Sequence, residues 1–229
     1  MHILLTDVLT CPRCGPAFGL ILISDEMRDR RVLRGGLGCP NCRESYPVVG
    51  GVADLRVRGE EGIEPEVEPP GGGAESSNGG DDAGVSGAGG AADSMESGYR
   101  VAALLGVGDL PSTVLVAGYP RSVSSAVAGL LPESQVAASI GGDEAPATGV
   151  SWICHGVRLP FRTGSLKGVA VAGKSAGELL AESARALAPG GRIVMENTPV
   201  GVVDRLAALG LELLLEQDGV VVASLSRPG

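Results

Sequence analysis

Two closely spaced cysteine pairs constrain this chain more than any other feature of its sequence. Cys11 and Cys14 form one CxxC motif, and Cys39 and Cys42 form a second one after 24 intervening residues. Each motif places two thiolates on one tight turn, and two such turns supply the four sulfur ligands of a tetrahedral zinc ion. Because four thiolates leave no open position for a substrate, we expect a structural zinc site that organises a small β-rich ribbon.

Three other chemistries use the same residues: a pair of disulfides, a redox-active CxxC motif, and an iron–sulfur cluster. The doubled spacing favours zinc over all three. The first residues, MHILLTDVLT, lack the basic start and long apolar run of a signal peptide. No stretch reaches the roughly 20 apolar residues of a membrane helix. We therefore expect a cytoplasmic chain without membrane contact, where paired cysteines bind metals more often than they form disulfides.

The segment Gly59–Met95 differs in composition from everything around it. It holds eleven Gly and nine Asp or Glu, and it has no Lys or Arg. Such a segment buries little apolar surface, so we expect a disordered acidic linker. The remaining 18 acidic residues match the 18 Lys and Arg of the chain, so the folded parts are neutral together. This balance gives no support for direct binding to nucleic acid.

Strand and helix patterns alternate after the linker. The chain is 44% hydrophobic but holds only two Phe, three Tyr and one Trp, so its core must be aliphatic. Apolar positions recur with helical spacing over Ala176–Ala188, and Pro189-Gly190-Gly191 is expected to end that helix. The expected strands are Thr113–Ala117, Gln135–Ser139, Ser151–Cys154, Gly168–Ala172, Arg192–Met195, Leu211–Glu216 and Val220–Leu225. The other expected helices are 96–105, Ser122–Leu131 and Val200–Leu209.

This alternation predicts an α/β fold, with a mostly parallel sheet, an antiparallel edge and helices on both faces. The expected organisation is a zinc ribbon over residues 1–58, a linker over 59–95 and a Rossmann-like α/β/α domain over 96–229.

The sequence around the cysteines carries a family resemblance. It reads LTCPRC at residues 9–14, GCPNC at 38–42 and YPVVGGVADL at 46–55. Over about residues 3–57 this resembles the zinc-ribbon family of the small activator subunit of tRNA methyltransferases. In that family the ribbon packs against a methyltransferase domain. The resemblance therefore implies a scaffold role for the ribbon, not catalysis.

The C-terminal half carries a second resemblance. Residues 159–169 read LPFRTGSLKGV, and residues 184–194 read ARALAPGGRIV. Both segments, with the expected terminal hairpin, resemble the class I S-adenosylmethionine-dependent methyltransferases. The resemblance implies a Rossmann-like three-layer domain. If the cofactor binds, it implies cofactor-binding roles for Gly118, His155 and Leu159.

The expected cofactor loop departs from that family's pattern. An acidic residue and three spaced glycines are usual there, where they let the backbone approach the cofactor. Here the acidic position holds Val116, Gly118 is the one glycine retained, and Pro120 has no N–H to donate.

Further along, Val136–Ser139 has no carboxylate to hold the ribose, and His155 and Lys167 replace two other acids. Each lost contact costs about 1–3 kcal/mol, which moves a micromolar affinity toward the millimolar range.

Two other groups of polar residues follow predicted strands. Cys154 and His155 are adjacent on one strand and point to opposite faces, so a nucleophile–base pair is not expected. Glu196, with Asn197 and Thr198, follows a strand at its carboxyl end, where α/β proteins bind ligands. These three residues either line a pocket or cap a helix before Pro199.

Together these patterns predict a non-catalytic or regulatory methyltransferase-like protein with a structural zinc ribbon and no catalytic residues of its own. It would act through a protein partner, either a methyltransferase or a second copy of itself. The eroded loop makes S-adenosylmethionine a doubtful cofactor. The alternative is an active, divergent methyltransferase whose ribbon helps to present its substrate.

Overall fold

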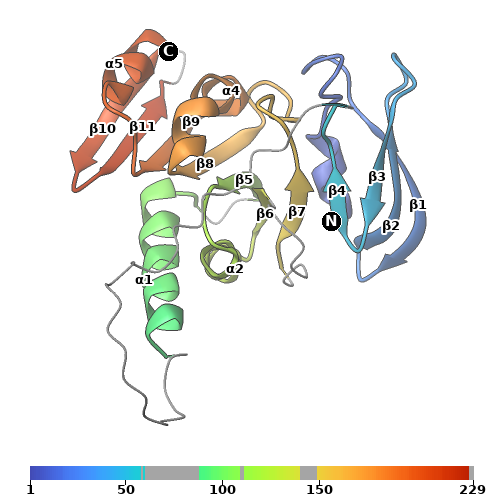
Figure 1. Ribbon diagram of the computed structural model, residues 1–229, viewed down its shortest axis with the longest axis horizontal. Helices are drawn as coiled ribbons and strands as arrows, with labels where there is room; N and C mark the ends of the chain where they lie inside the picture. Colours follow the sequence, from blue (N-terminus) through green and yellow to red (C-terminus); the bar gives the residue numbers. More distant parts are fainter. Residues whose placement is uncertain (58, 60–87, 109–110, 140–148, 227–229) are drawn as a thin grey trace, which may run out of the picture.

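The computed structural model describes residues 1–57, 59, 88–108, 111–139 and 149–226, and they share one large mixed sheet (Figure 1). Its strand order is β1-β2-β3-β4-β7-β6-β5-β8-β9-β11-β10. The strands are β1 (Ile21–Arg28), β2 (Arg31–Gly38), β3 (Ser45–Val49), β4 (Val52–Asp54), β5 (Ser112–Ala117), β6 (Ser134–Ser139), β7 (Ser151–Cys154), β8 (Leu166–Ala172), β9 (Leu187–Glu196), β10 (Leu211–Gln217) and β11 (Val220–Leu225). The helices are η1 (Ile3–Asp7), α1 (Ala88–Leu105), α2 (Arg121–Leu130), α3 (Lys174–Glu178), α4 (Leu180–Ala186) and α5 (Val202–Ala208). None of these helices is both long enough and apolar enough to cross a membrane.

The middle of the sheet is parallel, as the sequence predicts. Strands β7, β6, β5, β8 and β9 run in one direction, and β5 pairs with β6 on one side and β8 on the other. The strand order therefore reverses between β5 and β8, which is where open α/β sheets bind ligands at their carboxyl ends. The terminal hairpin adds β11 antiparallel to β9 and β10 antiparallel to β11.

Helices cover both faces of this parallel region, because alternate residues of its strands point to opposite sides. Val114 and Val116 of β5 pack in one apolar cluster with residues of α1 and α2. Leu115, between them, packs in a second cluster with residues of α3, α4 and α5. Two separate apolar layers on one sheet make the three-layer α/β/α sandwich that the sequence predicts.

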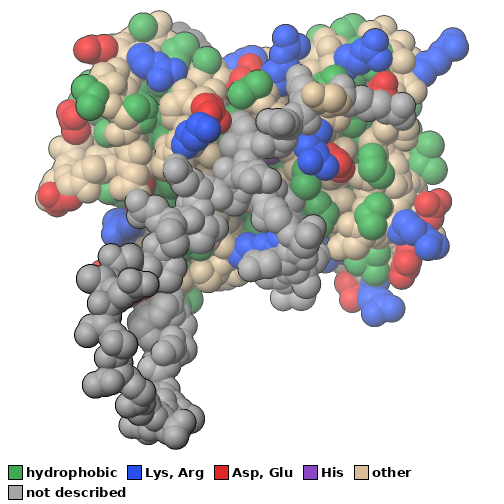
Figure 2. All heavy atoms as spheres, in the orientation of Figure 1, with side chains coloured by type: hydrophobic (Ala, Val, Ile, Leu, Met, Phe, Trp, Pro, Cys, Tyr) green, Lys and Arg blue, Asp and Glu red, His purple; other side chains and the backbone are tan. Residues whose placement is uncertain are grey.

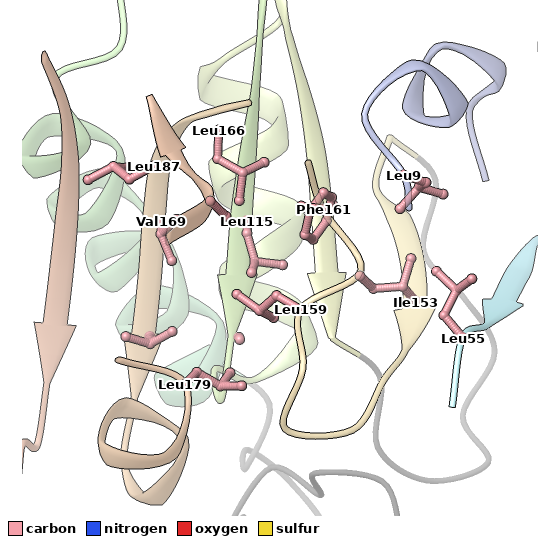
Figure 3. Close-up of a cluster of buried hydrophobic side chains, with 14 of the residues drawn as sticks. Leu9, Leu55, Leu115, Ile153, Leu159, Phe161, Leu166, Val169, Leu179 and Leu187 are labelled. Carbon is pink, nitrogen blue, oxygen red and sulfur yellow. The ribbon is translucent and has the colours of Figure 1, made fainter. Parts of the chain in front are cut away.

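The ribbon continues the same sheet. Strands β1 to β4 form an antiparallel meander, and β4 then pairs in parallel with β7, with Ala53 opposite Ile153. Leu9 and Leu55 of the ribbon belong to the same buried cluster as Ile153 and Phe161 (Figure 3). A shared ladder and a shared apolar cluster join the two halves, and the continuous sheet through β4 and β7 is a detail that the sequence patterns do not indicate.

Two sequence-based expectations about helices are wrong. Helix α1 begins at Ala88, inside the expected linker 59–95, of which residues 60–87 lie outside the described part. Within the expected part of the helix, Gly98 lies directly against Ala126 of α2, so this glycine lets the two helices pack closely. The expected helix 176–188 is divided into α3 and α4.

The expected helix stop at Pro189-Gly190-Gly191 lies inside β9. Leu187 already pairs with Leu166, and an irregularity in the register follows. Gly190 has a φ of 69°, which suits the displaced backbone of such an irregularity.

Candidate functional site

The structure brings the four predicted cysteine ligands together. Their sulfur atoms all lie within 4.8 Å of one another. Cys11 Sγ lies 3.7 Å from Cys42 Sγ, and Cys39 Sγ lies 3.9 Å from Cys14 Sγ. Four sulfurs held tetrahedrally at about 2.3 Å from one ion lie about 3.8 Å apart, so the spacing fits a single metal ion.

The same distances weigh against the other cysteine chemistries. A disulfide joins its sulfurs at about 2.05 Å, and all four cysteines are free thiols in this structure. A multi-iron cluster spreads its thiolates around several iron atoms, whereas these four converge on one point. The donor set of four thiolates suits zinc or a single iron ion.

Local structure forms both knuckles. At the first, the Cys14 N–H donates to Cys11 Sγ at 3.4 Å, and Gly15 turns the chain with a φ of 91°. At the second, burial alone would raise the pKa of the Cys39 thiol, but hydrogen bonds from the backbone N–H groups of Cys42 and Asn41, together with those to the thiols of Cys42 and Cys11, lower that pKa to about 7. A thiol with this pKa supplies much of the thiolate form near neutral pH, as a metal ligand must.

The Tyr46 hydroxyl supports the centre from the core side. It lies 3.4 Å from Cys11 Sγ, where it can donate to a thiolate, and both residues are buried. Burial, and then the neighbouring Cys11, raise the pKa of Tyr46 well above its usual value, so the hydroxyl stays protonated as a donor. Tyr46 belongs to the YPVVGGVADL segment of the family resemblance, but its position beside the cysteine cluster does not follow from the sequence.

A second candidate site is a cavity of about 1030 Å³ at the carboxyl ends of β5, β8 and β9. Gly118, Tyr119 and Pro120 line it after β5, Ala172 and Gly173 after β8, and Glu196 with Asn197 after β9. Residues Asp93, Ser97 and Arg100 of α1 form another wall. The cavity therefore lies at the switch point, and the expectation that Glu196 faces a pocket has structural support.

The three sequence-predicted cofactor residues do not lie together. Gly118 lines the large cavity, with a φ of 75°. A Cβ at Gly118 would collide with the Ala172 carbonyl oxygen, so the packing of two strand ends already requires this glycine without any ligand. Leu159 is buried in the core, and its backbone lines a different, smaller cavity beside Cys11 and Pro12.

His155 is buried and forms hydrogen bonds within the protein. Its Nε2 lies 2.6 Å from Ser139 Oγ, and its Nδ1 lies 2.7 Å from the Gly156 carbonyl oxygen. Since a carbonyl can only accept, Nδ1 carries the proton and Nε2 accepts from Ser139. Burial lowers the pKa of His155, so the ring is neutral near pH 7.

The strongest charge pair of the large cavity is Arg100 with Glu196. Arg100 Nε donates to Glu196 Oε1 at 3.0 Å, and this contact raises the pKa of Arg100 above its usual value. The side chain of Glu196 is 11% exposed and that of Arg100 is 47% exposed. Tyr119 beside them is buried, and among the described residues its Oη has no hydrogen-bond partner. Neither Arg100 nor Tyr119 was expected from the sequence.

No protein-family model matches this sequence, and no curated protein matches it. Solved structures similar to it include a geranyl diphosphate methyltransferase in complex with SAM, at 16% identity and a TM-score of 0.46, covering 62% of this chain and 93% of that one. The mycinamycin-pathway methyltransferase MycE, bound to Mg, SAH and mycinamycin VI, matches at 13% identity and a TM-score of 0.49, covering 60% of this chain and 47% of that one.

A precorrin-6y C5,15-methyltransferase from Geobacter metallireducens GS-15 matches at 16% identity and a TM-score of 0.43, covering 57% of this chain and 88% of that one. Of these three structures, MycE is covered least, and this chain spans about half of its length. At these identities and scores the likenesses carry no argument about substrate or activity. The Rossmann-like assignment rests on the strand order and the two helical layers described above.

Proposed function

We propose that this chain is a non-catalytic, regulatory methyltransferase-like protein that acts through protein partners and is braced by a structural zinc ribbon. The observation that carries the proposal is the hydrogen bond between Ser139 and His155 at the carboxyl ends of β6 and β7. The methyltransferases that this half resembles have carboxylates at these two positions. Here two neutral side chains bond to each other, and neither offers a carboxylate to a ribose.

Further residues of the cavity agree with this proposal. Val116, at the expected acidic position, is buried in the apolar cluster between β5 and the helices, where a carboxylate would be costly. Pro120 precedes α2 and has no N–H, and among the described residues no side chain caps that helix. The residues present therefore do not fit S-adenosylmethionine, and we assign no step to that cofactor.

Calorimetry with S-adenosylmethionine tests the proposal. Titration into the zinc-loaded full chain should give no saturable heat below about millimolar concentration, because several contacts of about 1–3 kcal/mol are missing. Saturable binding in the micromolar range would contradict it.

One observation favours the alternative of an active, divergent methyltransferase: a cavity of about 1030 Å³ lies at the switch point, which is roomy enough for a cofactor and a substrate. Transfer of a labelled methyl group to RNA, protein or a small molecule by the purified chain would support this alternative and refute the non-catalytic function.

Zinc is the ion that we assign to the cysteine centre, with a structural role, because its tetrahedral thiolate sites are closed. We place the protein in the cytoplasm, where thiols remain reduced and available as ligands. The resemblance to the activator-subunit ribbon belongs to the same proposal, since the ribbon packs against a methyltransferase-type sheet in this chain too.

An apolar strip on the ribbon is the partner surface that we favour. Ile21, Ile23 and Val49 are 58%, 65% and 67% exposed (Figure 2 shows hydrophobic side chains over this part of the molecule). Cross-strand register puts all three on one face, with Ile21 and Ile23 opposite the small residues Gly38 and Gly36, and Val49 opposite Arg34. Exposed apolar patches of this kind mark interaction sites.

Sedimentation equilibrium shows whether the partner is a second copy of this chain or a separate methyltransferase. If a second copy is the partner, the weight-average mass rises with concentration, and Ile23→Asp abolishes the rise while Leu214→Asp, at the opposite sheet edge, does not. A chain that stays monomeric points to a separate methyltransferase. Loss of self-association in both variants would contradict the assignment of this strip.

A further inference from the structure

Two cavities meet at the ion pair between Arg100 and Glu196. The first is the large cavity at the switch point, and the second has a volume of about 380 Å³. Both are lined by Arg100, Glu196 and Asn197. The second extends between α1 and the terminal hairpin, with apolar walls from Leu104, Leu215 and Val220. A molecule in the second cavity would therefore have its polar end at the ion pair.

The two partners of this ion pair differ in how easily they can separate. The Glu196 side chain is 11% exposed, so a carboxylate without its cation would remain largely shielded from water. The Arg100 side chain is 47% exposed, and its long stem lets the guanidinium turn into solvent. A ligand can thus replace the arginine at low cost, provided that it brings its own positive charge to Glu196.

The surroundings of Glu196 offer further acceptors for such a charge. An ammonium group carries three N–H donors and needs three acceptors. Besides the carboxylate, Asn197 lines both cavities, and Tyr119 lines the first. Tyr119 is buried, and its Oη has no hydrogen-bond partner among the described residues.

We propose that these joined cavities bind a small amine, with its ammonium on Glu196 in place of Arg100 and its apolar chain between α1 and the terminal hairpin. An anionic ligand is disfavoured, because binding to Arg100 would leave the carboxylate of Glu196 without its cation. The site goes beyond the proposed function, since amine binding requires neither S-adenosylmethionine nor methyl transfer.

Calorimetry of the zinc-loaded full chain with octylamine tests the proposal, with octanol and octanoate as probes of the same chain length. Octylamine should bind at least about tenfold more tightly than either control probe. The variant Glu196→Gln should weaken octylamine binding about tenfold or more. The variant Arg100→Gln should strengthen it, because the competing cation is gone. Glu212→Gln removes an exposed acid that lines neither cavity and should change nothing.

Other outcomes overturn the proposal. If octanoate binds most tightly and Arg100→Gln abolishes its binding, the site selects anions. If all three probes bind equally, the cavity recognises only an apolar chain. If no probe binds at all, the cavity is not a ligand site. Circular dichroism of each variant separates loss of the site from loss of the fold, and a purely structural Arg100 would not produce tighter amine binding.

Discussion

Cys39 shows how single residues prepare the metal centre. Burial alone would raise the pKa of its thiol, but the backbone N–H groups of Cys42 and Asn41 and the neighbouring thiols of Cys42 and Cys11 together hold it at about 7. We expect the purified chain to hold one zinc ion, and Cys39→Ser to lose it, because three thiolates bind a structural ion far less tightly than four. Atomic absorption checks the zinc content. The control Cys154→Ser, outside the cluster, should keep the ion; zinc retained in both variants would contradict the assigned ligands.

His155 makes stability depend on pH at the residue scale. Burial lowers the pKa of His155 in the folded state below the usual 6.5, so the unfolded chain takes up a proton at a higher pH than the folded chain. Stability contributed by the neutral ring is present above about pH 6.5 and is lost as the pH falls below it.

The variant His155→Gln stays neutral and can still accept from Ser139. Between about pH 7 and about pH 5.5 the wild type should lose up to about 1 kcal/mol more stability than this variant. Urea unfolding at each pH measures the difference in free energy of unfolding between the two proteins. Any loss of zinc at low pH affects both equally, because they carry the same ribbon. Parallel pH profiles would show that His155 is not buried as a neutral ring.

At the scale of elements, Arg185 of α4 clamps the segment between β7 and β8 against the ribbon. Its guanidinium donates to the carbonyl oxygens of Leu159 and Phe161 at 2.9 and 2.8 Å, and to Glu182. The same segment pairs with the ribbon, since Thr10 N–H donates to the Pro160 carbonyl oxygen at 2.9 Å. One side chain thus fixes the loop that supports the first cysteine knuckle.

Arg185→Ala should lower the free energy of unfolding by about 2 kcal/mol, because it leaves half-buried carbonyl oxygens without their charged donor. Lys174→Ala serves as the control. Its pair with Glu178 is 3.7 Å long and the lysine is 74% exposed, so the cost should stay below about 0.5 kcal/mol. Urea unfolding followed by the fluorescence of Trp152 gives both values. Equal costs for the two variants would contradict the clamp.

Elements and ligands were predictable from sequence to different degrees. The CxxC spacing identified the four cysteines that the structure brings together, and buried runs such as 113–117 located most of the parallel strands within a residue or two. The break of the helix near Leu179 and the strand start at Leu187 were missed, because pairing of Leu187 with Leu166 overrides helical periodicity. Local patterns do not indicate Arg100 or Tyr119 as cavity residues, because only the fold brings α1 and the end of β5 beside Glu196.

At the scale of the whole molecule, ribbon and sandwich form one sheet and share one of its two apolar clusters. Strand β4 pairs with β7, and Trp152, the chain's one tryptophan, lies in β7. Removal of zinc by a chelator should therefore lower the unfolding midpoint of the entire chain in a single transition, because binding energy at the cysteines is folding energy. Trp152 fluorescence and far-ultraviolet circular dichroism should change together. An early ribbon transition that leaves Trp152 unchanged would contradict this coupling.

The central claim for the whole molecule is a methyltransferase-type sandwich whose cofactor contacts have been replaced by internal ones, such as that between Ser139 and His155. Equilibrium dialysis of the zinc-loaded full chain against labelled S-adenosylmethionine tests it most directly, with an active methyltransferase as the positive control. We predict no enrichment of label on the protein side at micromolar cofactor. Enrichment that saturates at one molecule per chain would contradict the claim and make this protein a cofactor-binding methyltransferase.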